Sequence, residues 1–248
     1  MSEIIARLRA AGIEGAESEA RKLSEQFSGD ALEIAIERRV NREPMSHILG
    51  YRDFWRDRFI VTKNVLDPRP DSELFIDIAL QSEAPETVLD LGSGSGALGL
   101  SVLREFPNAH CVFADISIEA LGVAKQNAEN LQLSNRSRFI QSDWFSNIEE
   151  KFNLLLCNPP YIRIDEMPHL SPELSFEPPI ALTPGGDGLA PYRIIAEHLS
   201  SVLTQNGRAL FEHGFEQQDK VAKIFASKGF STRNHADLSK NPRIVEVF

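Results

Sequence analysis

A buried strand that runs into a glycine-rich turn constrains the fold of this 248-residue chain more than any other feature. Residues 87–91 read Thr-Val-Leu-Asp-Leu, the turn spans residues 92–96, and leucines at helical spacing follow it. Glycines let the main chain come close to a bulky ligand, and ligands of open α/β sheets bind beyond the carboxyl ends of the strands. The segment therefore predicts an α/β fold with a ligand crevice at the end of this strand.

Alternating strand and helix patterns extend this prediction from about Leu74 to the end of the chain. Such alternation indicates an open, mostly parallel sheet with helices on both faces. Ser117 is a good N-cap for one helix, Pro191 suits the first turn of a later one, and Asn206-Gly207 is expected to end that later helix. The last two strands are expected to pair as an antiparallel ribbon. The expected strands span residues 87–91, 110–115, 138–141, 152–157, 208–213, 230–234 and 244–248.

Three patterns follow one another along the chain and predict three units. The first has apolar residues at helical spacing and ends at Pro44, which predicts a small helical N-terminal domain. The second has aromatic residues around Arg56-Asp57 and then Pro68-Arg69-Pro70, which predicts a hairpin connector with a stiff loop. The third is the alternating catalytic domain. The expected boundaries are residues 1–44, 45–73 and 74–248.

Side chains after the next two strands predict a pocket for an adenosyl group. Asp115 closes one strand, where its carboxylate could bridge two ribose hydroxyls, while Asp143 could accept from an adenine amino group and Trp144 could cover the ring. The turn reads G-x-G-x-G rather than the G-x-G-x-x-G of dinucleotide sites, which favours an amino-acid tail over a pyrophosphate. The candidate cofactor-binding residues are Gly92, Ser93, Gly94, Ser95, Gly96, Asp115, Asp143, Trp144 and Asn158.

The run Cys157-Asn158-Pro159-Pro160-Tyr161 follows an apolar strand. Two successive prolines fix their own φ angles and keep the preceding residues extended, so the acceptors of this run point one way. Asn158 Oδ1 and the Pro159 carbonyl can each accept one N–H of an NH2 group, and Tyr161 offers a ring face for stacking. The run therefore predicts a site that holds a planar NH2 group for N-alkylation. The candidate catalytic residues are Asn158, Pro159 and Tyr161, and the candidate substrate-binding residues are Asn158, Pro159, Pro160 and Tyr161.

The formal net charge of −10 disfavours direct nucleic-acid binding, because such affinity comes mostly from Lys and Arg on phosphates. Cys111 and Cys157 lie in apolar runs and form neither a disulfide framework nor a zinc site, so we expect a cytoplasmic protein without a metal. No stretch reaches the length of a membrane span, and the N-terminal charges lie too close together for a signal peptide. We expect an unprocessed, soluble monomer.

In combination, these segments resemble the N5-glutamine methyltransferases that modify peptide chain release factors. Adenine-N6 and guanine-N2 methyltransferases share the Asn-Pro-Pro-Tyr run, whereas the Pro-Arg-Pro loop and the Gly-Gly-Asp-Gly-Leu segment are typical of the protein-glutamine branch. This chain has Asp67 and Ser72 where the family's loop usually has Ile and Thr, and its N-terminal domain is shorter than usual. The resemblance covers most of the chain and rests on Glu43-Pro44, Gly50, Phe54-Trp55, Pro68–Glu73, Asp90–Gly96, Gln141–Phe145, Asn158–Tyr161, Phe176–Pro178 and Gly185–Leu189.

The resemblance implies the Rossmann-like, seven-stranded fold of class I methyltransferases, with a small helical domain that helps grip the release factor. It also implies that Gly92–Gly96, Asp115 and Trp144 hold S-adenosylmethionine. Residues Asn158–Tyr161 would then receive the glutamine of the Gly-Gly-Gln motif of the release factor. The implied reaction is methyl transfer from S-adenosylmethionine to the side-chain amide nitrogen (N5) of that glutamine.

Other functions remain open on the residues alone. The same chemistry could modify a glutamine of a ribosomal protein or an exocyclic amine of nucleic acid, and the glycine turn also suits a noncatalytic adenosyl-binding protein or a nicotinamide oxidoreductase. His213 at a strand end is expected to be a packed neighbour rather than an acid or base. Glu177 is expected either to contact substrate or to cap a loop.

Overall fold

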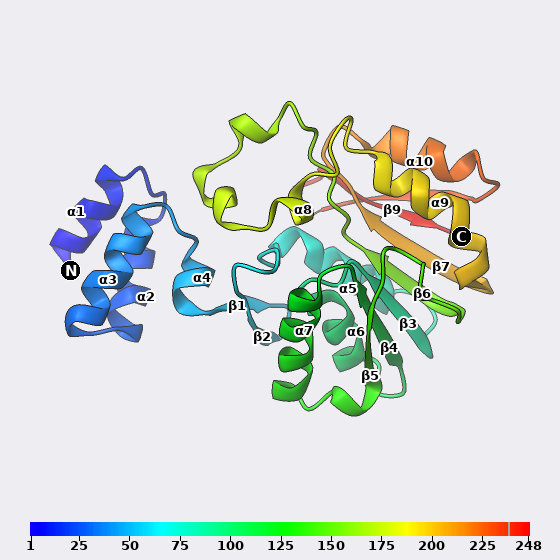
Figure 1. The fold of residues 1–248 in the computed structure, drawn as a ribbon, viewed down its shortest axis with the longest axis horizontal. Coiled ribbons are helices and arrows are strands. Elements are labelled where there is room, and N and C mark those ends of the chain that lie inside the picture. The colour runs from blue at the N-terminus through cyan, green and yellow to red at the C-terminus, as the bar shows by residue number, and fades with distance from the viewer. Residues whose placement is uncertain (238) are drawn as a thin grey trace.

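A seven-stranded sheet forms the centre of the computed structural model, which describes residues 1–237 and 239–248 (Figure 1). In sheet order the strands are β5 (Ser137–Gln141), β4 (His110–Asp115), β3 (Thr87–Leu91), β6 (Phe152–Cys157), β7 (Leu203–Glu212), β9 (Pro242–Val247) and β8 (Thr232–Ala236). The strands from β5 to β7 are parallel, whereas β9 pairs antiparallel with both β7 and β8. The expected mostly parallel sheet and the terminal antiparallel ribbon are confirmed.

Helices cover both faces of the sheet, because successive side chains of each strand point to opposite faces. Val88 points into one core with α5 (Leu74–Leu80), α6 (Ala97–Glu105) and α7 (Ile118–Asn130). Leu89 points into the other core with α9 (Ala190–Val202) and α10 (Gln218–Ala226). As expected, Ser117 caps α7, since its Oγ accepts the Ala120 N–H at 3.1 Å. Within the described ranges, no helix combines the length and the apolar composition needed to cross a membrane.

The end of α9 differs from the expectation. This helix ends at Val202 and β7 begins at the next residue, so Asn206-Gly207 lies inside a strand and the predicted helix stop was wrong. A Cβ at Gly207 would lie 2.7 Å from the carbonyl oxygen of Phe152, and the register of β6 against β7 shifts here. The glycine therefore serves a close approach of two strands at an irregular register, which is a common role of glycine in a strand.

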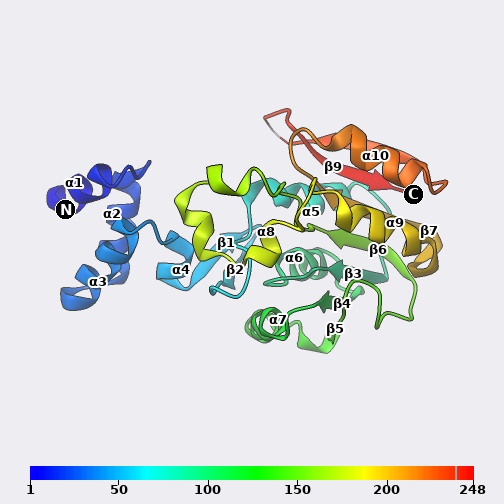
Figure 2. The same cartoon turned by 45° about the horizontal axis from the view of Figure 1, so that its top comes forward.

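A helical unit at the N-terminal end has its own core and lies apart from the sheet (Figures 1 and 2). Leu8 and Leu23 are completely buried in this core. In the hairpin that follows, Phe54 and Phe59 pack edge to face at 6.0 Å within the core beneath α5, α6 and α7. The elements are α1 (Ser2–Ala10), α2 (Ala16–Gln26), α3 (Gly29–Val40), α4 (Met45–Leu49), β1 (Tyr51–Phe54), β2 (Asp57–Ile60) and the 3-10 turn η1 (Pro70–Glu73).

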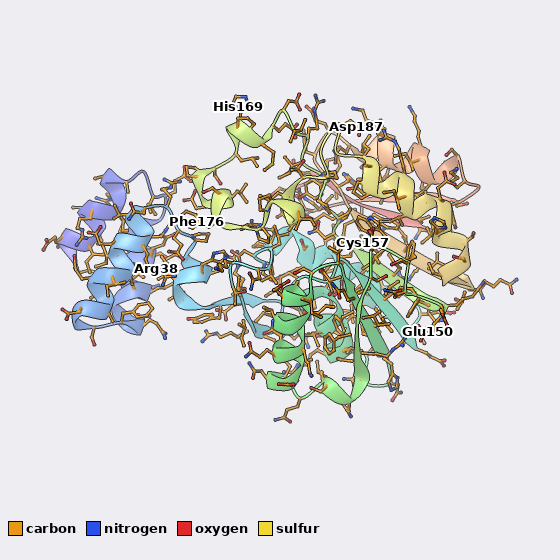
Figure 3. All side chains as sticks on the ribbon, in the orientation of Figure 1. Arg38, Glu150, Cys157, His169, Phe176 and Asp187 are labelled. Carbon is orange, nitrogen blue, oxygen red and sulfur yellow. The ribbon has the colours of Figure 1, made fainter. Side chains whose placement is uncertain are left out.

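Residues 162–182, here called the covering segment, leave the sheet after β6 and extend toward the helical unit (Figure 2). Phe176 lies on the side of this segment that faces the helical unit (Figure 3). Glu173 Oε1 lies 3.1 Å from Arg39 Nη1 and 2.8 Å from Arg42 Nη2, so ion pairs join the segment to α3 and the turn after it. The short helices are η2 (Ser134–Arg136), η3 (Met167–His169), η4 (Pro172–Phe176) and α8 (Pro179–Leu182), of which all but η2 belong to the segment.

Candidate active site

The carboxyl ends of four neighbouring parallel strands meet at a cavity of about 280 Å³. Gly92 directly follows β3, Asp115 ends β4, Ser142 follows β5 and Asn158 follows β6, and all four line this cavity. The covering segment closes part of it through Ile180 and the residues beside it. Most of the predicted site residues are brought together here, namely Gly92, Ser93, Gly94, Ser95, Asp115, Asp143, Trp144, Asn158 and Pro160.

The glycine turn presents its main chain to the cavity. Gly92 and Gly94 have φ angles of 73° and 53°, and no heavy atom of the described residues lies within 4 Å of the point where a Cβ would stand. This open space beside the main chain is what close approach of a ligand requires. Gly96 lies elsewhere, because its α-carbon faces α7, where a Cβ would stand 3.1 Å from Ala124 Cβ. Gly96 therefore serves helix packing rather than the cavity wall.

Asp115 ties the glycine turn to the end of β4. Its Oδ2 accepts the Gly94 N–H at 2.8 Å and its Oδ1 accepts the Ser117 N–H at 2.9 Å. Burial raises the pKa of Asp115, while these backbone hydrogen bonds act in the opposite direction. Each carboxylate oxygen can accept more than one hydrogen bond, so acceptor capacity remains toward the cavity that Asp115 lines.

Asp90 lies behind the turn and is almost completely buried. Its Oδ2 accepts the Gly99 N–H at 2.9 Å, and burial raises the pKa of Asp90 to about 8. At Gly99 a Cβ would lie 2.5 Å from the Phe113 ring, so α6 packs on the sheet more closely than a side chain there would allow. Asp90 thus links β3 to α6 by a hydrogen bond and does not line the cavity.

Asp143 and Trp144 form the wall that follows β5. Asp143 is exposed, and Trp144 is partly buried with a positive φ of 48°. Ser142 holds this turn by donating its Oγ hydrogen to the Trp144 carbonyl oxygen at 2.8 Å and by accepting the Asn147 N–H at 3.0 Å. The turn therefore places a carboxylate and an indole on the cavity wall, as the predicted adenine pocket requires.

Asn158 borders two cavities. Besides the first, it lines a second cavity of about 240 Å³ together with Pro159 and Tyr161. Residues of the Pro-Arg-Pro loop and of the covering segment, such as Arg69 and Ala181, also line both. A group held at Asn158 from the second cavity would therefore face a ligand in the first.

A buried carboxylate beneath this run escaped the sequence analysis. Glu212, the last residue of β7, accepts the Tyr161 hydroxyl at 3.2 Å and the Ser72 hydroxyl at 2.5 Å. Burial raises the pKa values of both Tyr161 and Glu212. Its signal in the sequence is a charged residue at the end of the apolar run Ala209-Leu210-Phe211.

The two residues with open roles lie beside the site. His213 is fully buried, its Nδ1 lies 2.9 Å from the Gly214 carbonyl oxygen, and burial lowers its pKa. These contacts fit the expected packed neighbour. Glu177 Oε1 accepts from Arg69 Nη2 at 2.5 Å, so Glu177 joins the covering segment to the Pro-Arg-Pro loop.

Residues 58–190 match the family model described as the methyltransferase small domain. A release factor glutamine methyltransferase of Cereibacter sphaeroides is 40% identical, and the alignment covers 98% of this chain and 95% of that protein. A protein of Rickettsia bellii named bifunctional methyltransferase is 38% identical over 90% of this chain. The chain spans 46% of that Rickettsia protein, which is about half of its length.

A solved structure of a methyltransferase from Pyrococcus furiosus has the same fold. Its TM-score is 0.58 at 13% sequence identity, and the match covers 77% of this chain and 87% of that one. At this identity the likeness concerns the fold alone. It agrees with the seven-stranded, Rossmann-like sheet described above.

Proposed function

The chain belongs to the release factor glutamine methyltransferase family, and we propose that it transfers a methyl group from S-adenosylmethionine to the side-chain amide nitrogen of a glutamine in a class I release factor. The observation that carries this proposal is the position of Asn158 between two cavities. One cavity has walls suited to an adenosyl cofactor. The other reaches the same asparagine from the side of the covering segment.

The residues of the first cavity fit S-adenosylmethionine. The open main chain at Gly92 and Gly94 suits the amino-acid tail of the cofactor, Asp115 suits the ribose hydroxyls, and Asp143 with Trp144 suits the adenine. Ser93, Ser95 and Asn158 complete the proposed cofactor site. When bound, this cofactor supplies the electrophilic methyl group.

Asn158 and Pro159 are the proposed acceptors for the substrate amide. The side-chain oxygen of Asn158 and the carbonyl oxygen of Pro159 would each accept one N–H of the glutamine NH2 group, and Tyr161 would pack against the amide plane. An amide nitrogen is a poor nucleophile because its lone pair is delocalised into the carbonyl. Two acceptors on its hydrogens hold the nitrogen toward the first cavity and stabilise positive charge that develops on it.

The same acceptors discriminate glutamine from glutamate. A carboxylate would turn its lone pairs toward the oxygens of Asn158 and Pro159 and would leave both acceptors without donors. Each unpaired buried group costs roughly 1–3 kcal/mol, so a glutamate at the same position is rejected.

We propose that residues 1–44 help dock the release factor, that residues 45–73 connect them to the main domain, and that residues 74–248 form the catalytic domain. Glu173 supports this division of roles, because its ion pairs with Arg39 and Arg42 join the helical unit to the covering segment, which lines both cavities. A protein bound across the helical unit would thereby lie next to the entrance used by its glutamine.

The test is a methylation assay with defined substrates. The protein is incubated with methyl-labelled S-adenosylmethionine and a purified class I release factor, and peptide mass spectrometry locates the label. The variant of the release factor with Gln→Glu in its Gly-Gly-Gln motif is the matched control. We expect one methyl group on that glutamine and none on the variant.

Two further substrates complete the assay. Ribosomal protein and single-stranded DNA are offered separately under the same conditions, because both could present an NH2 group to the same site. Label on either of them, with none on the release factor, would overturn the proposed substrate. Label on the Gln→Glu variant would overturn the proposed role of the two acceptors.

A further inference from the structure

The carboxylate of Glu212 is the centre of a buried hydrogen-bond chain that ends at Asn158. Ser72 Oγ donates to Glu212 Oε2 at 2.5 Å, and Asn158 Nδ2 lies 3.4 Å from Ser72 Oγ. On the other side, the Tyr161 hydroxyl donates to Glu212 Oε1 at 3.2 Å. The chain brings together η1, the end of β7 and the run after β6, and Ser72 and Glu212 are 140 residues apart in the sequence.

The directions of these hydrogen bonds follow from the chemistry of their groups. An ionised carboxylate only accepts, so Ser72 and Tyr161 must both donate to Glu212. A serine hydroxyl has one hydrogen, and Ser72 uses it on Glu212. Ser72 can therefore only accept from Asn158, and the contact at 3.4 Å has to come from the NH2 side of the asparagine amide.

This direction matters because the two ends of an asparagine amide have nearly the same shape. With Nδ2 toward Ser72, the oxygen Oδ1 points away from Ser72, and it is available to a group in the cavities that Asn158 borders. The reversed amide would present donor hydrogens to the donor hydrogens of a glutamine NH2 group. The contact with Ser72 is long and thus weak. Ser72 can nevertheless only accept, and this favours the orientation with Nδ2 toward Ser72 over the reversed one.

From this geometry we infer that Glu212 is a positioning residue, which acts through Ser72 to keep the Asn158 amide oxygen toward the substrate and acts directly on the hydroxyl of Tyr161. The inference rests on the proposed function, because it assigns Asn158 to the substrate amide. Glu212 itself does not contact the reacting atoms in this scheme. Its buried carboxylate accepts from Ser72 and Tyr161, which leaves the Ser72 oxygen as a fixed acceptor for Asn158.

The surroundings hold Glu212 firmly. The Tyr192 hydroxyl donates to the main-chain oxygen of Glu212 at 2.7 Å, which fixes the end of β7. The charged groups that face the carboxylate are Arg243 on β9 and Asp71 on η1, and Arg243 Nη2 lies 2.9 Å from Asp71 Oδ2. Burial and Asp71 raise the pKa of Glu212, while Ser72, Arg243 and Tyr161 favour its charged form.

The first test is the variant Glu212→Gln, which keeps the shape but offers either an acceptor or a donor to Ser72. We expect kcat for the release factor to fall about tenfold or more, while its KM and the Kd of S-adenosylhomocysteine stay within about threefold. Glu246→Gln is the matched control, because Glu246 is also buried in the sheet but bonds Arg208, Arg233 and His235 instead. An unchanged kcat in Glu212→Gln, or an equal loss in Glu246→Gln, would overturn the inference.

The second test asks whether Glu212 acts through Ser72. Ser72→Ala removes the hydroxyl and should lower kcat as Glu212→Gln does. Ser72→Thr keeps a hydroxyl and should therefore keep most of the wild-type kcat. The double variant with Glu212→Gln and Ser72→Ala should have a kcat little below that of the less active single variant. In the wild type, kcat should fall at acid pH as Glu212 takes up a proton, and Glu212→Gln should lose this acid limb. Multiplying effects in the double variant, or a retained acid limb, would contradict the relay.

A third measurement needs no methyl transfer and so separates this inference from the proposed function. The side-chain NH2 signals of Asn158 are recorded by NMR in protein labelled with 15N at asparagine. Glu212→Gln should shift these signals although its hydrogen-bond link to Asn158 runs through Ser72, whereas Glu246→Gln should not. Unchanged signals in Glu212→Gln would overturn the relay even for an active enzyme, whereas a wild type that methylates no release factor would overturn only the proposed function.

Discussion

Gly188 packs directly against the carbonyl oxygen of Tyr161, so closely that a Cβ at Gly188 would lie 2.2 Å from that oxygen. The same oxygen accepts the Gln217 side-chain N–H at 2.9 Å. The Gly-Gly-Asp-Gly-Leu segment thus contacts the main chain of the proposed substrate site from behind. This close approach gives a physical reason for the glycine at position 188 of the motif.

Gly188→Ala should therefore displace Tyr161 and lower kcat by about tenfold or more, because small displacements of positioning groups are costly in catalysis. Gly186→Ala is the matched control, since Gly186 also has a positive φ, of 55°, but within the described part of the chain no heavy atom lies within 4 Å of its Cβ position. Both variants should lose about 1 kcal/mol of unfolding free energy from backbone strain, and Gly188→Ala should lose more than Gly186→Ala because its Cβ meets main-chain atoms of Tyr161. Steady-state kinetics and urea unfolding measure the two effects, and equal activity of the two variants would contradict the contact's role.

Asn158→Ala should lower kcat by about a hundredfold or more, because it removes one of the two oxygens proposed to hold the substrate amide. The Kd of S-adenosylhomocysteine, measured by calorimetry, should stay within a few-fold of the wild-type value. Turnover close to normal would remove Asn158 from the mechanism. A large loss of cofactor affinity would instead assign Asn158 mainly to the cofactor.

Asp90→Asn should remove a pH dependence of stability. Burial raises the pKa of Asp90 from 3.8 to about 8 in the folded chain, so between these values the folded chain keeps a proton that the unfolded chain releases. Wild-type stability should therefore fall as pH rises through this window, by up to about 1.4 kcal/mol per pH unit, and level off above about pH 8.

Urea unfolding at about pH 5 and about pH 8 measures this slope. The stability of Asp90→Asn relative to the wild type should increase from the lower to the higher pH, because asparagine has no proton to lose. Asp77→Asn, which changes an exposed carboxyl group on α5, should follow the wild type. Parallel curves for Asp90→Asn and the wild type would show that the Asp90 carboxyl group titrates alike in both states.

Glu173→Gln should raise the KM for the release factor several-fold with little change in kcat or in cofactor affinity. The substitution weakens the ion pairs that join the covering segment to Arg39 and Arg42, while Arg39 keeps Glu19 at 2.6 Å. Arg39 is only 6% exposed, so the free energy lost with its ion pair to Glu173 should exceed that of an ordinary surface ion pair. Glu166→Gln, on the same segment, is the control, and an equal KM for all three proteins would argue against docking across α3.

Much of this molecule could be predicted from local sequence. The strand, glycine turn and helix at residues 87–105 follow from composition and spacing, and so do the capping of α7 by Ser117 and the parallel strand pattern. The family and the fold expected from the combined motifs are confirmed. Most of the candidate cofactor residues also line one cavity, because parallel strands end at a common edge. The roles of these residues stay predictions.

What the sequence did not reveal depends on contacts between distant segments. Glu212 and Ser72 form a buried hydrogen bond across 140 residues, and a local sequence pattern does not predict such a contact. Asn206-Gly207 has the signature of a helix end, yet its glycine serves an interstrand contact with Phe152. Gly96 belongs to the turn by sequence, but its surroundings are set by α7. In each case tertiary packing decides what a local signal can mean.

The position of β9 between β7 and β8 also has a consequence for biosynthesis. Glu212 pairs with Ile244, and β8 has β9 as its partner, so β9, which follows both β7 and β8 in the chain, has to enter between two strands made before it. Until that strand emerges, the half of the sheet that carries Glu212 keeps an open edge. A nascent chain therefore completes this sheet only after β9 has left the ribosome, although β7 and β8 are made earlier.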